Sequence, residues 1–528
     1  MLLASTAAFY EFLPQIIRYH VSLVALCVGA LATWRVYRFR IIPALYPDDP
    51  KELPYWIPAK PDVGRQLTRD SGHLIAFFGN SNALLTRATR YFGYSMEPYA
   101  LSVAGLKTYV LTNADHVGEA YRNTETLSYE EFVRGLMRIL GNSQAGVKAM
   151  FTPLAKDKEG FPNPHEKPLG LLFRQMHIHQ LFPGENLDFL ETRFYKFFKN
   201  HLELARISDT CPYAVSKSSE DVVLPLTQWC SDFFVRGGQG AYFGPKLAYQ
   251  VIYQYPRFLA KAMLTARDGV LNSLRDYLQL PHNQRREDAW FVKAMEEGMR
   301  AVGLSDEDMA IATMTIYWAY VLSCSPSGTP SLVDTVWQET LPAFRDDGTV
   351  DFEYLHTSVP NLDGVWNEML RLSTFAASVR FITADTIIGT KVLRKGNRLI
   401  IPYRQLHMDK SVYGADVDQF RHSRFLENPR LTQTNRFRPF GGGATMCPGR
   451  HIAKRAVYLF TAMVLHEFDI EIVGQRRALE PDLTKPVPGL MSPQVGQELH
   501  VKLSPRKRSM YDVELASSSV RSNWLFVA

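Results

Sequence analysis

The chain has 528 residues, of which 46% are hydrophobic and 21% charged, and its net charge is +6. This is the composition of a globular protein with ample length for a large core, so a disordered or fibrous chain is excluded. The basic residues form no dense Lys/Arg blocks, and we therefore expect no nucleic-acid partner. No internal repeat or Gly/Ser linker divides the sequence, which favours one large domain.

The cysteines point to a reduced compartment. They form no Cys-x-x-Cys pair and no even framework, so the sequence predicts neither a disulfide scaffold nor a zinc site. This usage fits a catalytic domain that faces the cytosol. The five positions are Cys27, Cys211, Cys230, Cys324 and Cys447.

Residues 12–34 form the first predicted element, a mostly apolar segment that Arg18 and His20 interrupt. Its uninterrupted part is short for a membrane span, so a cleaved signal peptide or a peripheral segment is the alternative. Trp34 is followed by three arginines within six residues. An interfacial aromatic followed by positive charge is typical of the cytosolic end of a span. We therefore predict a single-pass anchor in the endoplasmic reticulum, with the rest of the chain facing the cytosol.

Proline and polarity mark the ends of the main domain. Five prolines between residues 43 and 58 predict a basic, proline-rich hinge over 35–58, because proline cannot continue a helix. The main domain is expected over 59–504, and a polar tail over 505–528. Within the domain, residues 96–122 predict short strands followed by the start of a helix. A loop is expected over 148–170, and the pattern is then mainly helical to about residue 300.

A buried helix is predicted next. Ser305 and Asp308 have the spacing of a capping box, and the run from Met309 to Leu322 is apolar on nearly every face. Further helices and short strand-like pieces follow. The fold class is therefore mainly α with small β sheets.

The loop around Cys447 differs from the settings of the other cysteines. Gly441, Gly442 and Gly443 precede it and let the backbone approach a bulky group, while Pro448 and Gly449 turn into a helix. A buried, inert cysteine is the alternative. The start of a helix favours a thiolate, however, and a thiolate in an apolar loop suits the proximal side of a haem iron.

The segment Phe440-Gly-Gly-Gly-Ala-Thr-Met-Cys447-Pro-Gly449 resembles the cysteine-ligand loop of cytochromes P450. The resemblance implies the P450 fold and haem b, with Cys447 as the iron ligand and Phe440 and Gly449 beside the cofactor. Thr445 stands where the family usually has an arginine. This departure is similar to the branch that holds the cholesterol hydroxylases and prostacyclin synthase, and it leaves one propionate contact open.

The family also has a buried cluster of one glutamate and two arginines. Glu-x-x-Arg alone is unspecific here, since it begins at Glu119, Glu131, Glu203, Glu297, Glu368 and Glu427. Only Glu368–Arg371 combines a helical context with the right position before Cys447, and Arg424 before Phe425 fits the third member. Such a cluster is expected to be structural.

The resemblance also assigns residues that would contact the haem propionates. Arg380 stands where the family places an arginine on a haem propionate, and a solvated strand arginine is the alternative. The family's Trp-x-x-x-Arg helix is not recognisable. Arg174, His177 and His179 are candidate substitutes, and an ordinary amphipathic helix is the alternative.

The apolar helix lacks the acid–alcohol pair that delivers protons in most members of the family. Thr313 and Thr315 are the hydroxyl residues near its middle and are the candidate catalytic residues. Threonine in a buried helix also often bonds only to its own backbone.

Together these features imply a haem-thiolate monooxygenase that oxidises a hydrophobic molecule, such as a sterol, a terpenoid or a related specialised metabolite. Family analogy implies electrons from NADPH through a membrane-bound cytochrome P450 reductase. The missing acid keeps a second hypothesis open, a haem-thiolate isomerase or dehydratase that needs neither O2 nor a reductase. A non-catalytic haem or lipid carrier is the third.

Overall fold

The computed structural model describes residues 2–506 apart from 57–71, 104, 156–160, 245–260, 286, 322–329, 475–478, 485–488 and 495. For residues 2–18, 261–266, 315–321 and 330–331 the description covers the backbone alone. The predicted hinge residues 57–58, the tail from 507 onward and Cys324 lie outside the described residues.

The described chain divides into two compact units. Unit 1 comprises Met1–Tyr129, Ala377–Leu406 and Leu483–Pro486, and unit 2 comprises the remaining segments. No linker marks the division because the chain leaves unit 1 and later returns, so that late strands complete a sheet begun by early ones.

A mixed six-stranded sheet forms the centre of unit 1, in the order β1-β2-β3-β10-β7-β4. β10 pairs parallel to β3 and antiparallel to β7. A small apolar core on this sheet includes Leu84, Tyr99 and Ile400. The strands and helices are β1 (Lys51–Glu52), β2 (Tyr99–Val103), β3 (Leu106–Val110), β4 (Leu127–Ser128), β7 (Ala377–Ile382), β8 (Thr386–Ile388), β9 (Lys391–Leu393), β10 (Arg398–Pro402), α3 (Leu74–Gly79), α4 (Ser81–Tyr91), α5 (Ala114–Arg122) and α18 (Tyr403–His407).

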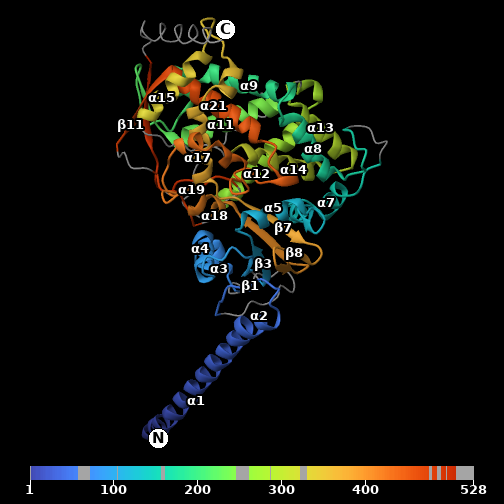
Figure 1. The fold of residues 1–528 in the computed structure, drawn as a ribbon, viewed down its shortest axis with the longest axis vertical. Helices are drawn as coiled ribbons and strands as arrows, with labels where there is room; N and C mark the ends of the chain where they lie inside the picture. Colours follow the sequence, from blue (N-terminus) through green and yellow to red (C-terminus); the bar gives the residue numbers. More distant parts are fainter. Residues whose placement is uncertain are drawn as a thin grey trace. The chain divides into compact units, whose positions relative to one another are not determined.

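The N-terminal helix is longer than the predicted anchor. α1 (Leu2–Val36) continues through a π-helical turn, η1 (Tyr37–Ile41), into α2 (Ile42–Leu45) (Figure 1). Pro43 does not stop it, because proline in the first turn of α2 needs no backbone N–H. Tyr19–Leu45 is long and apolar enough to cross a membrane, and it is the one such segment in the described part of the chain. A signal sequence has the same properties.

Within unit 1, the two ends of the predicted hinge contact each other. Arg35 Nη1 donates to the Tyr55 carbonyl at 2.7 Å, and Arg38 Nη2 bonds Glu52 Oε2 at 2.6 Å. Residues 51–52 join the sheet as β1. The basic residues after the apolar run therefore contact the segment that leads into the sheet of unit 1.

Unit 2 is mainly helical and carries the large core. An aromatic group that includes Phe198, Trp229, Phe233 and Phe460 packs at its centre. The longer helices are α6 (Glu130–Leu140), α7 (Gln144–Met150), α8 (Leu169–Leu181), α9 (Glu185–His201), α10 (Leu204–Thr210), α11 (Leu226–Phe243), α12 (Lys261–Gln279), α13 (Trp290–Ala301), α14 (Asp306–Val321), α15 (Pro330–Thr340), α16 (Phe352–Thr357), α17 (Pro360–Ser373) and α21 (Arg450–Glu467).

Short elements complete unit 2. Its antiparallel sheet has the order β11-β12-β6-β5, and the fold class of helices with small sheets is confirmed. The short helices and the strands are α19 (Lys410–Tyr413), α20 (Ser423–Glu427), η3 (His282–Gln284), η4 (Leu341–Ala343), η5 (Pro429–Gln433), η6 (Gly443–Thr445), β5 (Ser216–Lys217), β6 (Val222–Pro225), β11 (Phe468–Val473) and β12 (His500–Pro505).

The start of α14 follows the predicted capping box. The Asp308 N–H donates to Ser305 Oγ at 3.1 Å, and Ser305 Oγ donates to Asp308 Oδ2 at 3.0 Å. Residues 309–314 are all buried, as expected for a helix that is apolar all round.

Candidate functional site

The loop before α21 presents Cys447 at the start of that helix. Gly441 and Gly443 have φ of +76° and +57°, a region that favours glycine. The Cys447 N–H donates to the Phe440 carbonyl at 2.9 Å and closes the loop. Solvent reaches the cysteine, whereas Cys211 and Cys230 are buried. The loop therefore makes Cys447 the accessible cysteine of unit 2 among the described residues.

The protonation of Cys447 differs from the sequence-based expectation. Burial by neighbouring groups raises the pKa of its thiol, and the N–H groups of Gly449 and Arg450 and the charges of Arg450 and Arg174 lower it. The net direction is upward, so the helix start alone does not make this sulfur a thiolate. A bound metal would change the balance, because a cysteine ligand loses its proton on coordination.

The loop fits a metal whose other ligands come from a macrocycle. Among the described residues, no group of three or more His, Cys, Asp or Glu side chains could hold a metal ion. A Cβ added at Gly449 would lie 3.6 Å from Cys447 Sγ, so glycine keeps the space beside the sulfur open. Phe440 stacks on Trp366 with the ring centroids 6.3 Å apart, which fixes the start of the loop. One sulfur in an open glycine loop is the donor set that haem iron requires.

Of the three candidate substitutes for the Trp-x-x-x-Arg motif, Arg174 contacts the cysteine loop. Arg174 on α8 donates from Nη2 to the Met446 carbonyl at 3.4 Å, next to Cys447. His177 Nδ1 bonds the Phe173 carbonyl of its own helix, and the His179 ring packs on Trp290. Sequence reasoning could not choose among them, because the three lie within six residues on one helix.

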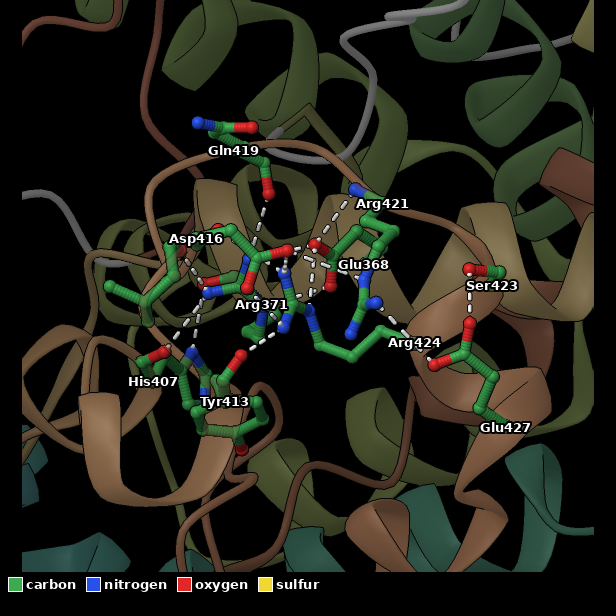
Figure 2. Close-up of polar contacts among 11 residues, drawn as sticks. Glu368, Arg371, His407, Tyr413, Asp416, Gln419, Arg421, Ser423, Arg424 and Glu427 are labelled. Atoms are coloured by element: carbon green, nitrogen blue, oxygen red, sulfur yellow. Dashed lines mark hydrogen bonds and ion pairs between the residues drawn. The ribbon is translucent and has the colours of Figure 1, made fainter.

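The predicted cluster of one glutamate and two arginines is confirmed (Figure 2). Arg371 donates to Glu368 through Nε at 2.8 Å and through Nη2 at 2.7 Å. Arg424 Nε lies 3.3 Å from Glu368 Oε1, and the Arg421 N–H donates to the same oxygen at 3.0 Å. The side chains of Glu368 and Arg371 are fully buried. The carboxylate is thus hydrogen-bonded on both oxygens, as a buried charge must be.

This cluster is connected to the cysteine loop. Arg371 Nη1 donates to the carbonyls of His407 and Val417, at 3.1 Å and 2.6 Å. The Arg438 N–H donates to His407 Nε2 at 2.8 Å, so Nδ1 carries the ring proton and bonds the Arg371 carbonyl. Arg438 lies two residues before Phe440. The buried charges therefore fix the chain that enters the cysteine loop.

Arg380 is buried rather than solvated, which excludes the alternative of a surface strand arginine. It lies on β7 in unit 1, and its Nη1 donates to Ser378 Oγ at 2.6 Å and to the Val379 carbonyl at 2.9 Å. Its role toward a haem propionate stays a prediction.

The candidate threonines lie on α14. Thr313 is buried, whereas the side chain of Thr315 lies outside the described residues. Sequence reasoning treated Asp308 as a cap only. Its carboxylate also accepts hydrogen bonds from the Ser143 N–H and hydroxyl, both at 2.7 Å, and from Asn142 Nδ2 at 3.2 Å. No local pattern predicts these contacts, since the partners are about 165 residues apart.

A family model described as Cytochrome P450 matches residues 328–501, the range that holds the charge cluster, Arg380 and the cysteine loop. A cytochrome P450 monooxygenase of Penicillium oxalicum, poxD, is 22% identical over 469 residues, which cover 83% of this chain and 90% of that protein. Residues 328–501 of the chain therefore carry a cytochrome P450 domain. The P450 domain and the P450 monooxygenase relatives show an oxidoreductase of the monooxygenase class, whose cofactor is a haem with a cysteine thiolate on the iron.

Two further relatives match shorter parts of this chain. A bifunctional cytochrome P450/NADPH–P450 reductase of Gibberella moniliformis is 34% identical over 145 residues, which cover 27% of this chain and 13% of that protein. Cytochrome P450 7A1 of Sus scrofa is 29% identical over 161 residues, which cover 28% of this chain and 32% of that protein. The similarity to the cholesterol-hydroxylase branch is therefore limited to a short part of the chain.

Proposed function

We propose that Cys447 is the axial ligand of a haem b, and that this P450 oxidises a hydrophobic small molecule of the sterol, terpenoid or related specialised-metabolite class. The observation that carries the proposal is the loop geometry, which holds one solvent-accessible cysteine at a glycine turn before α21. The bound haem would activate O2, so that one oxygen atom enters the substrate and the other leaves as water.

The residues around the sulfur would serve binding. Gly449 keeps space beside Cys447, and the N–H groups of Gly449 and Arg450 favour the anionic sulfur. Phe440 braces the loop through Trp366. Arg174 is a candidate to replace the missing propionate contact, and Arg380 is the candidate for a second one, because guanidinium groups bind carboxylates through paired N–H donors.

Proton supply would depend on α14, which has no acidic residue after Asp308 up to its end at Val321. We propose that Thr313 and Thr315 hold and pass protons through their hydroxyl groups, together with water. The hydroxyl of a threonine can donate one proton and accept another, which is the property that such a relay requires.

Electrons would come from NADPH through a cytochrome P450 reductase. The support is the relatives in which a P450 and an NADPH–P450 reductase form one chain. The haem domain would span residues 59–504 and face the cytosol, held at the endoplasmic reticulum by the N-terminal helix. This location rests on the apolar segment Tyr19–Leu45 and on the arginines in it.

Labelled oxygen tests the reaction class. Metabolites of cells with and without the protein identify the product, which is then made in membranes with ¹⁸O2, NADPH and reductase. We expect one ¹⁸O atom per product molecule and no turnover without NADPH. Product that forms without air and carries no label in air would support the isomerase hypothesis instead.

A further inference from the structure

Arg380 is surrounded by a group of polar side chains within unit 1 that neither the sequence motifs nor the proposed reaction explain. We call it the tyrosine–arginine cluster, and it consists of Tyr121, Tyr129, Ser378, Arg380 and Tyr403. They come from α5, the residue after β4, strand β7 and α18. All except Tyr129 are buried.

The strand fixes one nitrogen of the guanidinium. Ser378, Arg380 and Ile382 alternate on the buried side of β7, so Ser378 and Arg380 share a face. Nη1 is held between Ser378 Oγ and the Val379 carbonyl. The guanidinium carbon lies 5.7 Å from the ring centroid of Tyr121 and 5.0 Å from that of Tyr129. Both distances are within the range of cation–π attraction.

The Tyr121 ring is in turn held through its hydroxyl. Tyr121 Oη and Tyr403 Oη are 2.9 Å apart in a buried hydrogen bond. Burial and the neighbouring Tyr121 raise the pKa of Tyr403, so its hydroxyl stays neutral at physiological pH. Burial lowers the pKa of Arg380, but an arginine remains protonated in proteins. The cluster is therefore a fixed cation flanked by neutral hydroxyl groups, which is the chemistry that binds a carboxylate.

We infer that Tyr121 is a positioning residue: its hydroxyl bond to Tyr403 and its ring contact with Arg380 hold the guanidinium for a carboxylate of the haem. This inference rests on the proposed function, in which Arg380 binds a haem propionate. A substrate carboxylate has the same chemistry and is the other source that the test must distinguish.

The first measurement is the rate at which full-length holoprotein loses haem to excess apomyoglobin. Tyr121→Phe keeps the ring and removes the hydroxyl. We expect the rate of haem loss to become about tenfold faster, because a tenfold change corresponds to the free energy of about one hydrogen bond near a charged group. Tyr403→Phe should give the same increase, and the double variant no more than either alone. Tyr109→Phe is the matched control, because its buried hydroxyl accepts the Arg394 N–H at 3.2 Å on the same sheet.

The second measurement repeats the comparison with protein reconstituted with haem dimethyl ester, in which both carboxylates are blocked. The difference between Tyr121→Phe and the unchanged protein should then disappear. Equal haem loss in Tyr121→Phe and Tyr109→Phe would overturn the inference. A difference that persists with the ester would also overturn it, and binding of a carboxylate substrate would then be the alternative. If Tyr121→Phe does not fold, Tyr403→Phe gives the same decision.

The carbon monoxide spectrum separates the role of Tyr121 from the role of Cys447. A thiolate-type spectrum of the reduced, carbon monoxide-bound holoprotein together with unchanged haem loss in Tyr121→Phe would remove only the role of Tyr121. Absence of that spectrum in the unchanged protein would remove the proposed function itself.

Discussion

At the scale of single residues, spacing along the chain was informative only where the residues that contact each other are neighbours in sequence. Glu368 and Arg371 are three residues apart on α17 and meet as the helical spacing predicts. The surroundings of Arg380 could not be predicted, because Tyr121 lies more than 250 residues before it. Asp308 was predicted as a cap, but its bonds to Ser143 and Asn142 depend on the fold.

Removal of the buried carboxylate should destabilise the protein severely. Glu368→Ala would leave Arg371 buried without its ion-pair partner, which typically costs about 3–5 kcal/mol. We expect a clear fall in melting temperature and poor haem content on purification. Glu427→Ala is the control, since Glu427 also begins a Glu-x-x-Arg sequence but is exposed and pairs only at the surface, with Arg421 at 3.5 Å. Equal stability of the two variants would contradict the structural role of Glu368.

The threonines of α14 give a second prediction at this scale. The double variant Thr313→Val, Thr315→Val should lower product formation by about 10²–10⁴-fold, as expected for loss of a positioned proton donor. NADPH consumption should continue and yield hydrogen peroxide. Thr340→Val is the control, because its buried hydroxyl bonds only the carbonyls of its own helix, Val336 and Trp337. If the double variant and the control formed product equally well, these threonines would have no part in proton supply.

At the scale of elements, Asp308 joins the start of α14 to the segment before α7. Burial opposes its ionisation, but hydrogen bonds from Ser143, Asn142 and Ser305 outweigh this and lower its pKa. A carboxyl whose pKa is lower in the folded state stabilises the protein above its unfolded pKa of about 3.9, and this contribution is lost as the pH falls through the folded value.

Asp308→Asn should therefore reduce stability most at neutral pH. The difference in free energy of unfolding between the variant and the unchanged protein should shrink as the pH falls below about 4 and through the lowered pKa of the folded Asp308, because both side chains are neutral once that pKa is passed. Chemical denaturation between pH 3 and pH 7 measures it. Asp306→Asn on the same first turn, where Asp306 is exposed, should change stability little at any pH. A stability loss for Asp308→Asn that does not depend on pH would show that its charge is unimportant.

At the scale of the whole molecule, composition correctly predicted the fold class, whereas it carries no signal for the two compact units. The first unit is built from segments that are distant in sequence, and its boundaries fall in a sheet that carries no compositional signal. The cysteine loop was predictable because its glycines and Cys447 lie within nine residues. The extent of the N-terminal helix was not, because the helix continues past Val36 through a π-helical turn and Pro43 is tolerated in the first turn of α2.

The contacts between the end of this helix and Tyr55 lead to a prediction about truncation. Removal of residues 2–30 retains Trp34, Arg35 and Phe39, which contact Tyr55, whereas removal of residues 2–45 deletes them. Both variants should be released from membranes, but only the longer deletion should lower the melting temperature. Sedimentation of membranes and thermal unfolding measure these outcomes. Full membrane association of the longer variant would require a second membrane-binding surface.

The central claim, that Cys447 binds the iron of a haem, is tested most directly by the absorption spectrum of the reduced protein with carbon monoxide. The unchanged protein should have the red-shifted Soret band of thiolate-ligated haem, and Cys230→Ser, which alters a buried cysteine, should retain it. Cys447→Ser should lose that band while its circular dichroism stays native. A Cys447→Ser variant that kept the red-shifted band would contradict the assignment.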